Sequence, residues 1–482
     1  MIDLRPSLYV IGFLLATLAI AMVLPVLVDL AAGNPDWQVF LASAALTLFV
    51  GITLVLGFRV RRFRLTVRET FILTTVSWAA ITAFASLPFA FSSLGLSAAD
   101  AYFEAMSGLT TTGSTVIAGL DRAPPGLLLW RALLQWLGGI GIIVMAVAIL
   151  PMLGVGGMQL FRSESSDQAE KLLPRAAPFA TSITLIYGGL TMIWAAALWA
   201  AGMSPFEAIC HAMTTIATGG YSTSDGSIGH FASAWVDGIV IVGMLVGGMP
   251  FVLYLGAVRG NWSGLWRDGQ VRWFLAICAA MALMLGAWQW WTMDAAPLNA
   301  LRYATFNVVS VITGTGYATA SYDQWGTLAM TMLFFLMFVG GCTGSTTGGI
   351  KVFRYQVLFA AAQVQIRQLV RPHGVFVPHF NGKPVPEGVP WSVTGLFFLF
   401  FLAFAAVALG LALLGYDFVT SVSGAATAIA NVGPGLGPTI GPDGNFAGLD
   451  ESAKWLLAAA MLLGRLELFT VLVLFVPSFW RP

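Results

Sequence analysis

Charged residues are scarce in this chain of 482 residues: Asp, Glu, Lys and Arg make up 9% of it, against about 25% in a soluble globular protein. With 58% hydrophobic residues and a mean hydropathy of +0.84, it has too few polar side chains to cover a water-soluble surface of this size. The chain has no marked excess of basic charge, because its 23 Lys and Arg residues are balanced by 22 Asp and Glu residues. This balance argues against a nucleic-acid partner. The composition therefore predicts an integral membrane protein.

Cysteine and histidine are also few. The three cysteines, Cys210, Cys278 and Cys342, lie in apolar or glycine-rich stretches and match neither a zinc spacing nor a disulfide framework. His211 is one of four histidines, and no paired histidine spacing accompanies it. Neither a nucleophile–base constellation nor a nucleotide-binding loop occurs in the sequence. We expect no enzyme, no metal centre of His and Cys, and no covalent cofactor.

Long apolar runs dominate the rest of the chain. A transmembrane helix needs about 20 predominantly apolar residues. The candidate spans are residues 8–30, 38–58, 70–94, 127–150, 178–202, 235–258, 272–292, 326–350, 391–415 and 454–476. The first has too long an apolar run for a signal peptide and lacks a small-residue cleavage site. The sequence thus predicts an all-α, polytopic membrane protein.

The positive-inside rule orients these spans. Basic residues concentrate in four connections, at positions 59–68, 162–175, 259–272 and 351–383. All four fall on one side if each intervening semi-polar stretch dips into the membrane from the opposite face. The opposite connections carry ten acidic residues: Asp100, Glu104, Asp121, Glu207, Asp225, Asp294, Asp323, Asp417, Asp443 and Asp450. The N- and C-termini are therefore expected to be cytoplasmic.

An internal repeat runs through the semi-polar stretches. Each has Ser or Thr six residues before a glycine and Leu or Ile four residues before it. The glycines are Gly113, Gly220, Gly316 and Gly433, spaced by 107, 96 and 117 residues. Such periodicity predicts four units of helix, half-helix, motif and second helix around one central pore. We place two additional N-terminal helices in 1–60 and the units in 69–155, 176–260, 268–370, with a broken second helix, and 388–477.

The motif has a physical rationale. Irregular backbone at membrane depth cannot face lipid, because each unsatisfied backbone group costs several kcal/mol there. Glycine permits positive φ, so carbonyl groups can turn towards an axis that a Cβ would obstruct. Rings of carbonyl oxygens can replace the hydration shell of a cation, and the C-terminal ends of the half-helices add negative potential. Glycines also mediate ordinary helix packing, but four copies in one register disfavour that interpretation.

At these residues the chain resembles the TrkH branch of the Trk/Ktr/HKT potassium-transport superfamily. The similarity lies in Thr111-Thr112-Gly113-Ser114-Thr115, Ala217-Thr218-Gly219-Gly220-Tyr221, Thr313-Gly314-Thr315-Gly316-Tyr317 and Asn431-Val432-Gly433-Pro434-Gly435. It implies a selectivity filter that binds K⁺ through Thr111, Thr112, Gly113, Thr218, Gly219, Gly220, Gly314, Thr315, Gly316, Asn431, Val432 and Gly433. It further implies a lipid-embedded homodimer in the bacterial inner membrane with a cytoplasmic, TrkA-type nucleotide-binding regulatory subunit.

The resemblance also bears on selectivity. In plant relatives a serine at the first filter position accompanies Na⁺ preference, and this chain has Gly113 there, which favours K⁺ and admits Rb⁺. None of the four motifs is a full Thr-Val-Gly-Tyr-Gly, so fewer strong coordination layers and weaker discrimination against Na⁺ are expected.

A polar run interrupts the second helix of the third unit. Its residues are Gly340, Gly341, Cys342, Thr343, Gly344, Ser345, Thr346, Thr347, Gly348 and Gly349. Their poor helix propensity and small apolar surface predict a segment inside the protein, beneath the four motifs. The resemblance implies an intramembrane loop that gates the pore; the alternative is a glycine-rich packing seam.

Arg465 is the second candidate gate residue. It lies eleven residues past Lys454, about 16 Å along a helix and close to mid-bilayer, where a charge costs at least about 2.5–3.5 kcal/mol. The resemblance implies that Arg465 projects into the ion path and forms an electrostatic barrier. A structural ion pair is the alternative, although Glu467, two positions on, points about 200° round the helix and is a poor partner.

Three classes of function remain open. The first is a K⁺-selective, channel-like uptake subunit. The second is a carrier of the same fold that couples K⁺ to H⁺ or Na⁺, or a Na⁺-permeable relative. A carrier is expected to show inverted repeats with mid-membrane acids, whereas these repeats share one orientation. The third, a scaffold that transports nothing, gives no account of four glycine motifs.

Overall fold

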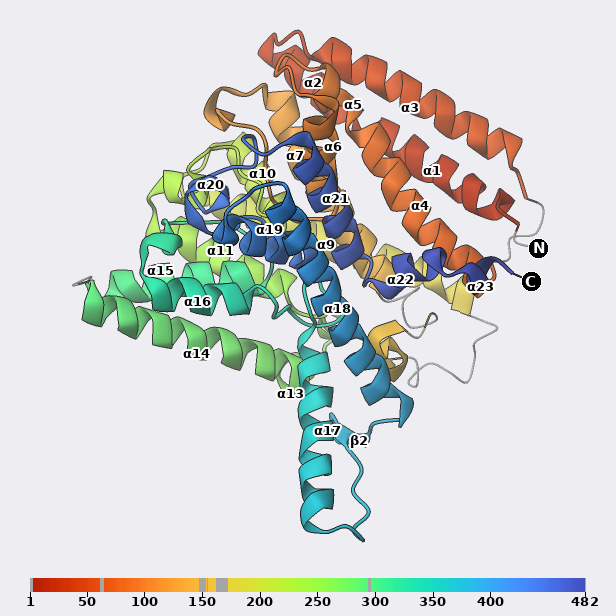
Figure 1. The fold of residues 1–482 in the computed structure, drawn as a ribbon. Helices are drawn as coiled ribbons and strands as arrows, with labels where there is room; N and C mark the ends of the chain where they lie inside the picture. The colour runs from red at the N-terminus through yellow and green to blue at the C-terminus, as the bar shows by residue number, and fades with distance from the viewer. Residues whose placement is uncertain are drawn as a thin grey trace.

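The computed structural model of the chain describes residues 3–60, 65–146, 153, 155–161, 172–293 and 296–481. Within these residues, seven helices are long and apolar enough to cross a bilayer, or nine if each of two bent helix pairs counts as one span. The predicted all-α, polytopic character is confirmed (Figure 1). Large apolar side chains point outwards from the long helices; in the 391–415 stretch, Phe398 is 67% exposed and Leu413 is 88% exposed.

The N-terminal region is a helical hairpin packed on the next unit. Its helices are α1 (Arg5–Ala21), α2 (Val23–Ala32) and α3 (Trp37–Gly57). α1 approaches α3 closely, because a Cβ on Gly12 would lie 2.8 Å from the Gly51 carbonyl oxygen. From α2, the buried Asp29 accepts a hydrogen bond of 2.7 Å from the Gly126 N–H at the start of α7. This contact fixes the hairpin to the first unit.

The first two units follow in sequence. The first contains α4 (Val67–Ala85), α5 (Leu87–Phe91), α6 (Ala98–Leu109), the 3₁₀ turn η1 (Leu120–Arg122), α7 (Pro125–Val144) and the turn η3 (Val155–Phe161). The second contains α9 (Leu172–Ala200), α10 (Pro205–Ile216), η5 (Ser227–Phe231), α11 (Ala234–Gly247), α12 (Phe251–Val258) and α13 (Ser263–Arg267). In both, the longest helices pack around a short central one, α6 or α10.

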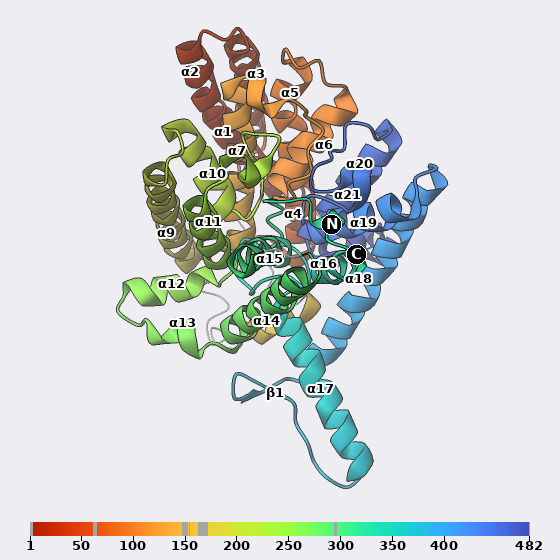
Figure 2. The same ribbon diagram turned by 90° about the vertical axis from the view of Figure 1, so that its left-hand side faces the viewer.

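The last two units repeat that arrangement. The third contains α14 (Gly269–Thr292), α15 (Pro297–Ile312), η6 (Tyr322–Gln324), α16 (Thr327–Leu336), α17 (Val352–Val370) and the strands β1 (His379–Phe380) and β2 (Lys383–Pro384). The fourth contains α18 (Gly388–Leu413), α19 (Phe418–Ala430), α20 (Gly437–Ile440), α21 (Glu451–Arg465), α22 (Phe469–Leu472), η7 (Val473–Phe475) and α23 (Pro477–Trp480). β1 and β2 form an antiparallel pair beside α17, which projects from the body (Figure 2).

Two of the predicted spans are not single continuous helices. The 235–258 stretch divides into α11 and α12, bent by 97°, and 454–476 divides into α21 and the α22–η7 segment, bent by 106°. Pro250, which lacks an N–H group, stands at the first bend. At the second bend, Glu467 and Leu468 have φ of 59° and 43°, so the helix cannot continue. In the predicted span 326–350, the helix ends at Leu336. Residues 147–150 of the predicted span 127–150 lie outside the described residues.

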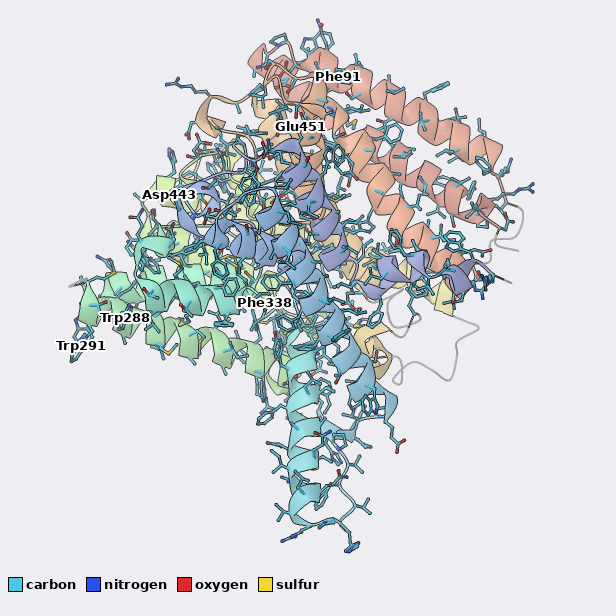
Figure 3. All side chains as sticks on the ribbon, in the orientation of Figure 1. Phe91, Trp288, Trp291, Phe338, Asp443 and Glu451 are labelled. Atoms are coloured by element: carbon cyan, nitrogen blue, oxygen red, sulfur yellow. The ribbon has the colours of Figure 1, made fainter. Side chains whose placement is uncertain are left out.

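Both ends of the chain meet at the start of α4. The Asp3 N–H donates to Glu69 at 3.1 Å, and Arg68 donates to the Arg481 carbonyl oxygen at 2.6 Å. Figure 1 shows the two ends side by side. At the opposite edge of the molecule, Trp291 stands 84% exposed at the end of α14 (Figure 3).

Candidate functional site

The four short helices α6, α10, α15 and α19 end in loops of one conformation. In each loop, the N–H of the residue before the repeated glycine donates to the carbonyl of the Ser or Thr five residues before that residue. These bonds are Thr112 to Ser107 at 2.9 Å, Gly219 to Thr214 at 2.8 Å, Thr315 to Ser310 at 2.9 Å and Val432 to Thr427 at 3.0 Å. The sequence repeat is therefore a repeat of backbone structure. We call these segments the first to fourth loops, around Gly113, Gly220, Gly316 and Gly433.

Left-handed backbone recurs at two positions of every loop. The glycines themselves have φ of 90° at Gly113, 79° at Gly220, 78° at Gly316 and 112° at Gly433. Two residues earlier, φ is 52° at Thr111, 49° at Thr218, 65° at Gly314 and 55° at Asn431. A threonine with positive φ is a strained residue. Strain repeated at equivalent positions marks these loops as a functional site.

The loops contact one another in a closed ring. A Cβ on each glycine would collide with the carbonyl oxygen of the residue that precedes the glycine in the next loop. The pairs are Gly113 with Gly219, Gly220 with Thr315, Gly316 with Val432, and Gly433 with Thr112. The order is thus first, second, third, fourth and back to first. The structure brings all twelve residues predicted as filter ligands into this ring.

Side-chain hydroxyls brace the first and third loops in the same way. Thr110 and Thr112 share a hydrogen bond of 2.8 Å, and Thr313 and Thr315 share one of 2.7 Å. The fourth loop is tied to the first, because Asn431 Nδ2 donates to Thr112 Oγ1 at 2.9 Å. The hydroxyls of Thr112 and Thr315 are thus engaged, whereas Thr111 Oγ1 and Asn431 Oδ1 have no hydrogen-bond partner among the described residues. Backbone carbonyl oxygens and these two side-chain oxygens are therefore available to meet a cation.

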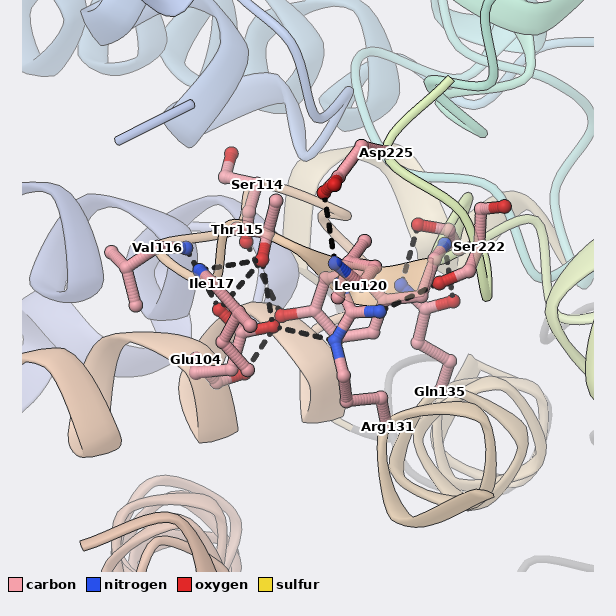
Figure 4. A network of polar contacts seen from close by, with 12 residues as sticks. Glu104, Ser114, Thr115, Val116, Ile117, Leu120, Arg131, Gln135, Ser222 and Asp225 are labelled. Carbon is pink, nitrogen blue, oxygen red and sulfur yellow. Dashed lines mark hydrogen bonds and ion pairs between the residues drawn. The ribbon is translucent and has the colours of Figure 1, made fainter. Parts of the chain in front are cut away.

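A buried ion pair supports the ring from outside (Figure 4). Glu104 on α6 accepts from Arg131 Nε at 2.8 Å and from the Val116 N–H at 2.9 Å. Arg131 also donates to the Ser222 carbonyl at 2.7 Å, and its guanidinium lies 3.9 Å over the Tyr221 ring. The first and second loops are thereby joined.

This ion pair was missed by sequence reasoning. Assigning Glu104 to a solvated outer connection is wrong, because its side chain is fully buried within α6. The available signal was Arg131, a charge in the middle of an apolar helix, where a buried partner is the rule.

Acidic groups cap the outer ends of three of the four central helices. Asp100 and Glu207 form capping boxes with the serines that precede α6 and α10, and Asp417 caps α19. Hydrogen bonds from Thr420 and Val419 hold the pKa of Asp417 below its usual 3.8, so this carboxylate stays charged at neutral pH. Negative charge at a helix N-terminus is stabilising, and each helix directs its C-terminal carbonyls at the ring.

Residues 340–349 form an irregular, largely buried segment against the ring. Thr346 Oγ1 donates to the carbonyls of Ile216 and Gly247, at 3.1 and 3.0 Å, and Thr218 Oγ1 lies 3.0 Å from it. Gly348 leaves no room for a Cβ, which would meet the Ala430 carbonyl oxygen at 2.5 Å. The segment therefore contacts the second and fourth loops at once.

Arg465 is the last residue of α21, next to the segment 340–349. Its side chain is 2% exposed, and its three guanidinium nitrogens have no hydrogen-bond partner among the described residues. Glu467 does not pair with it and instead accepts from Arg354 at 2.5 Å. Arg354 in turn donates to the Gly156 carbonyl at 2.9 Å. Arg465 is left as a buried cation without a counter-ion in the described structure.

These features define a class: a polytopic membrane protein with a ring of glycine loops suited to a desolvated cation. Residues 37–481 match the TrkH family of cation transport proteins, and the chain belongs to that family. Its members are transporters and not enzymes.

Curated relatives align with the chain nearly end to end. The Trk system potassium uptake protein TrkI of Halomonas elongata is 47% identical over 99% of this chain and 97% of its own. The TrkH protein of Escherichia coli K12 is 38% identical over 98% of both chains. The crystal structure of the potassium transporter TrkH from Vibrio parahaemolyticus superposes with a TM-score of 0.93 at 36% identity and full coverage of both chains.

Proposed function

We propose that this protein takes up potassium ions across the bacterial inner membrane, through a selectivity filter made of the four loops. The observation that carries the proposal is the closed ring, in which each glycine packs against the carbonyl of the next loop. Twelve residues supply the K⁺ ligands: Thr111, Thr112, Gly113, Thr218, Gly219, Gly220, Gly314, Thr315, Gly316, Asn431, Val432 and Gly433. Similarity to proteins named for potassium uptake and transport supports K⁺ as the ion.

Gating belongs to the segment 340–349 and to Arg465. The segment touches the second and fourth loops, so its displacement changes the space next to the ring. A buried guanidinium without a counter-ion repels a permeating cation and raises the barrier to conduction. Both features favour a gate over a glycine-rich packing seam.

The assembly we propose is a homodimer embedded in lipid and joined to a TrkA-type nucleotide-binding subunit. Both chain ends meet at the start of α4, which supports their lying on the same side of the membrane, and the basic connections assign that side to the cytoplasm. The regulatory nucleotide is assigned to the partner. The alternative is a symporter that couples K⁺ to H⁺ or Na⁺ within the same fold.

Growth of a potassium-uptake-deficient bacterium on limiting K⁺ tests the proposal. We expect the chain to restore growth, and more strongly with a TrkA-type partner. In liposomes, we expect K⁺ flux through the purified protein to follow the electrochemical gradient of K⁺ alone. A fixed requirement for H⁺ or Na⁺ identifies the symporter instead, and failure to move K⁺ under either condition overturns the proposal.

Gly113→Ser examines the filter assignment within the same assays. The Cβ of the introduced serine would collide with the Gly219 carbonyl oxygen, so the substitution displaces the second loop. We expect the K⁺-to-Na⁺ permeability ratio to fall by about three- to tenfold. Gly188→Ser on α9 is the control, because a Cβ there meets no atom within 4 Å. An unchanged ratio in Gly113→Ser counts against the assigned filter.

A further inference from the structure

The second loop differs from the others at the residue before its repeated glycine, Gly220. The first, third and fourth loops have Thr112, Thr315 and Val432 there, whereas the second has Gly219. Gly219 is absent from the positive-φ glycines, so its backbone conformation does not require a glycine. The available space does require a glycine, because a Cβ on Gly219 would overlap the side-chain amide of Gln135.

Gln135 forms hydrogen bonds with the second loop on both sides of Gly220. Its Nε2 donates to the Gly219 carbonyl at 2.5 Å, and its Oε1 accepts from the Tyr221 N–H at 3.0 Å. The side chain is fully buried on α7, a helix of the first unit. Both hydrogen-bonding atoms of the amide are thus committed to this loop (Figure 4).

The equivalent positions of the second and fourth units carry no amide. On α7, Gly138 packs against the carbonyl of Leu109, and on α11 and α21 Gly247 and Gly464 pack in the same way against Ile216 and Ile429. These contacts fix the register between the units. Three residues before these glycines stand Gln135, Met244 and Met461, all buried. A methionine of similar length therefore fills the place that the first unit gives to glutamine.

We propose that Gln135 is a positioning residue that sets ion selectivity by fixing the Gly219 carbonyl in the ring; the proposal rests on the proposed filter. A carbonyl oxygen has two lone pairs, so the amide takes one and leaves the other for an ion. Two successive glycines give the second loop backbone freedom that this bond restrains. Selectivity depends on the number and placement of the coordinating dipoles, and loosening one of four carbonyls admits Na⁺ more readily.

Gln135→Met tests the role in selectivity, because it installs the residue of the other units. We expect the K⁺-to-Na⁺ flux ratio in liposomes to fall by about three- to tenfold, because the hydrogen bond that holds the Gly219 carbonyl is lost together with the one from the Tyr221 N–H. Met244→Leu, a volume-conserving change at the equivalent position, keeps the wild-type ratio. A folded Gln135→Met protein with the wild-type ratio overturns the proposal, because a purely structural role affects stability and not ion choice.

A pair of variants tests the contact without any transport assay. Gly219→Ala places its Cβ into the Gln135 amide and lowers the thermal unfolding temperature. Gln135→Ala combined with Gly219→Ala removes that overlap and recovers part of the loss, whereas additive losses refute the contact. If the wild-type protein shows no preference for K⁺, the proposed function fails with the selectivity role. If the wild-type protein prefers K⁺ and the Gln135→Met protein retains that preference, only the proposed role of Gln135 fails.

Discussion

At the scale of single residues, four glycines share one physical reason for being glycine. Each has positive φ and each faces a carbonyl oxygen of the neighbouring loop, so an L side chain there meets both backbone strain and a collision. The sequence motif identified these positions because the requirement recurs at one spacing. It could not identify the colliding atom, which comes from another unit and, for Gly433, from Thr112 in the first unit.

Gly316→Ala is expected to abolish potassium uptake. Its Cβ would strike the Val432 carbonyl oxygen and lie 2.7 Å from Pro434 Cδ, an inflexible ring that cannot move aside. Uptake of ⁸⁶Rb⁺ by cells measures the effect, with Gly188→Ala as the matched control in open space. Substantial uptake by a Gly316→Ala protein would show that the third and fourth loops are not closely packed around the ion.

The Glu104–Arg131 pair is expected to dominate local stability. Arg131→Met leaves the Glu104 charge buried and unpaired, which destabilises by about 3–5 kcal/mol. Adding Glu104→Gln removes that charge, so the double variant unfolds at a higher temperature than Arg131→Met alone. Thermal unfolding in detergent, followed by loss of the folded species on size-exclusion chromatography, provides the comparison. Equal unfolding temperatures would mean that the pair is not coupled.

At the scale of elements, helix ends explain more than helix lengths. The hydropathy pattern predicted apolar stretches well, because lipid contact demands long apolar runs. The bends at Pro250 and Leu468 escaped prediction, because apolar residues continue on both sides of each break. Only the interruption at the glycine-rich run 340–349 was predicted from the sequence, because this run has a low helix propensity.

Thr346→Val is expected to raise basal ion flux. The substitution keeps the shape of the side chain but removes bonds to the carbonyls of Ile216 and Gly247, which hold the segment 340–349 against the second loop. Liposome flux without the partner subunit is the measurement. A reduced flux in folded protein would assign the segment to packing and not to a gate.

Arg465→Ala is likewise expected to raise flux, since it removes a buried positive charge without a counter-ion. Arg354→Ala serves as the comparison, because Arg354 has a partner in Glu467 and its loss leaves a buried carboxylate, which primarily lowers stability. If Arg465→Ala instead lowers the unfolding temperature as much as Arg354→Ala and leaves flux unaltered, Arg465 has a structural role.

At the scale of the whole molecule, orientation follows from charge and from where exposed segments project. We propose that the face from which α17 and its strand pair project is cytoplasmic, because this segment is one of the basic connections of the sequence, and that the acidic caps of α6 and α10 lie on the opposite face. The loop charges predict this sidedness, but they could not show that both chain ends meet at Glu69 and Arg68.

Cysteine labelling checks this orientation, because the three native cysteines are buried. Val375→Cys, at a position 93% exposed beyond α17, should react with an impermeant maleimide from the cytoplasmic side only. Asp121→Cys, exposed in the connection between α6 and α7, should react from the outside only. Labelling of both from one side would invert or refute the proposed topology.

The location of a bound alkali ion tests the central claim most directly. Crystals grown in rubidium chloride, with anomalous diffraction data collected at the rubidium edge, locate the ion without reference to activity. The account predicts an anomalous peak on the axis of the ring, within coordination distance of the carbonyl oxygens of Thr112, Gly219, Thr315 and Val432. A rubidium ion bound elsewhere, with the ring unoccupied at saturating concentration, would contradict it.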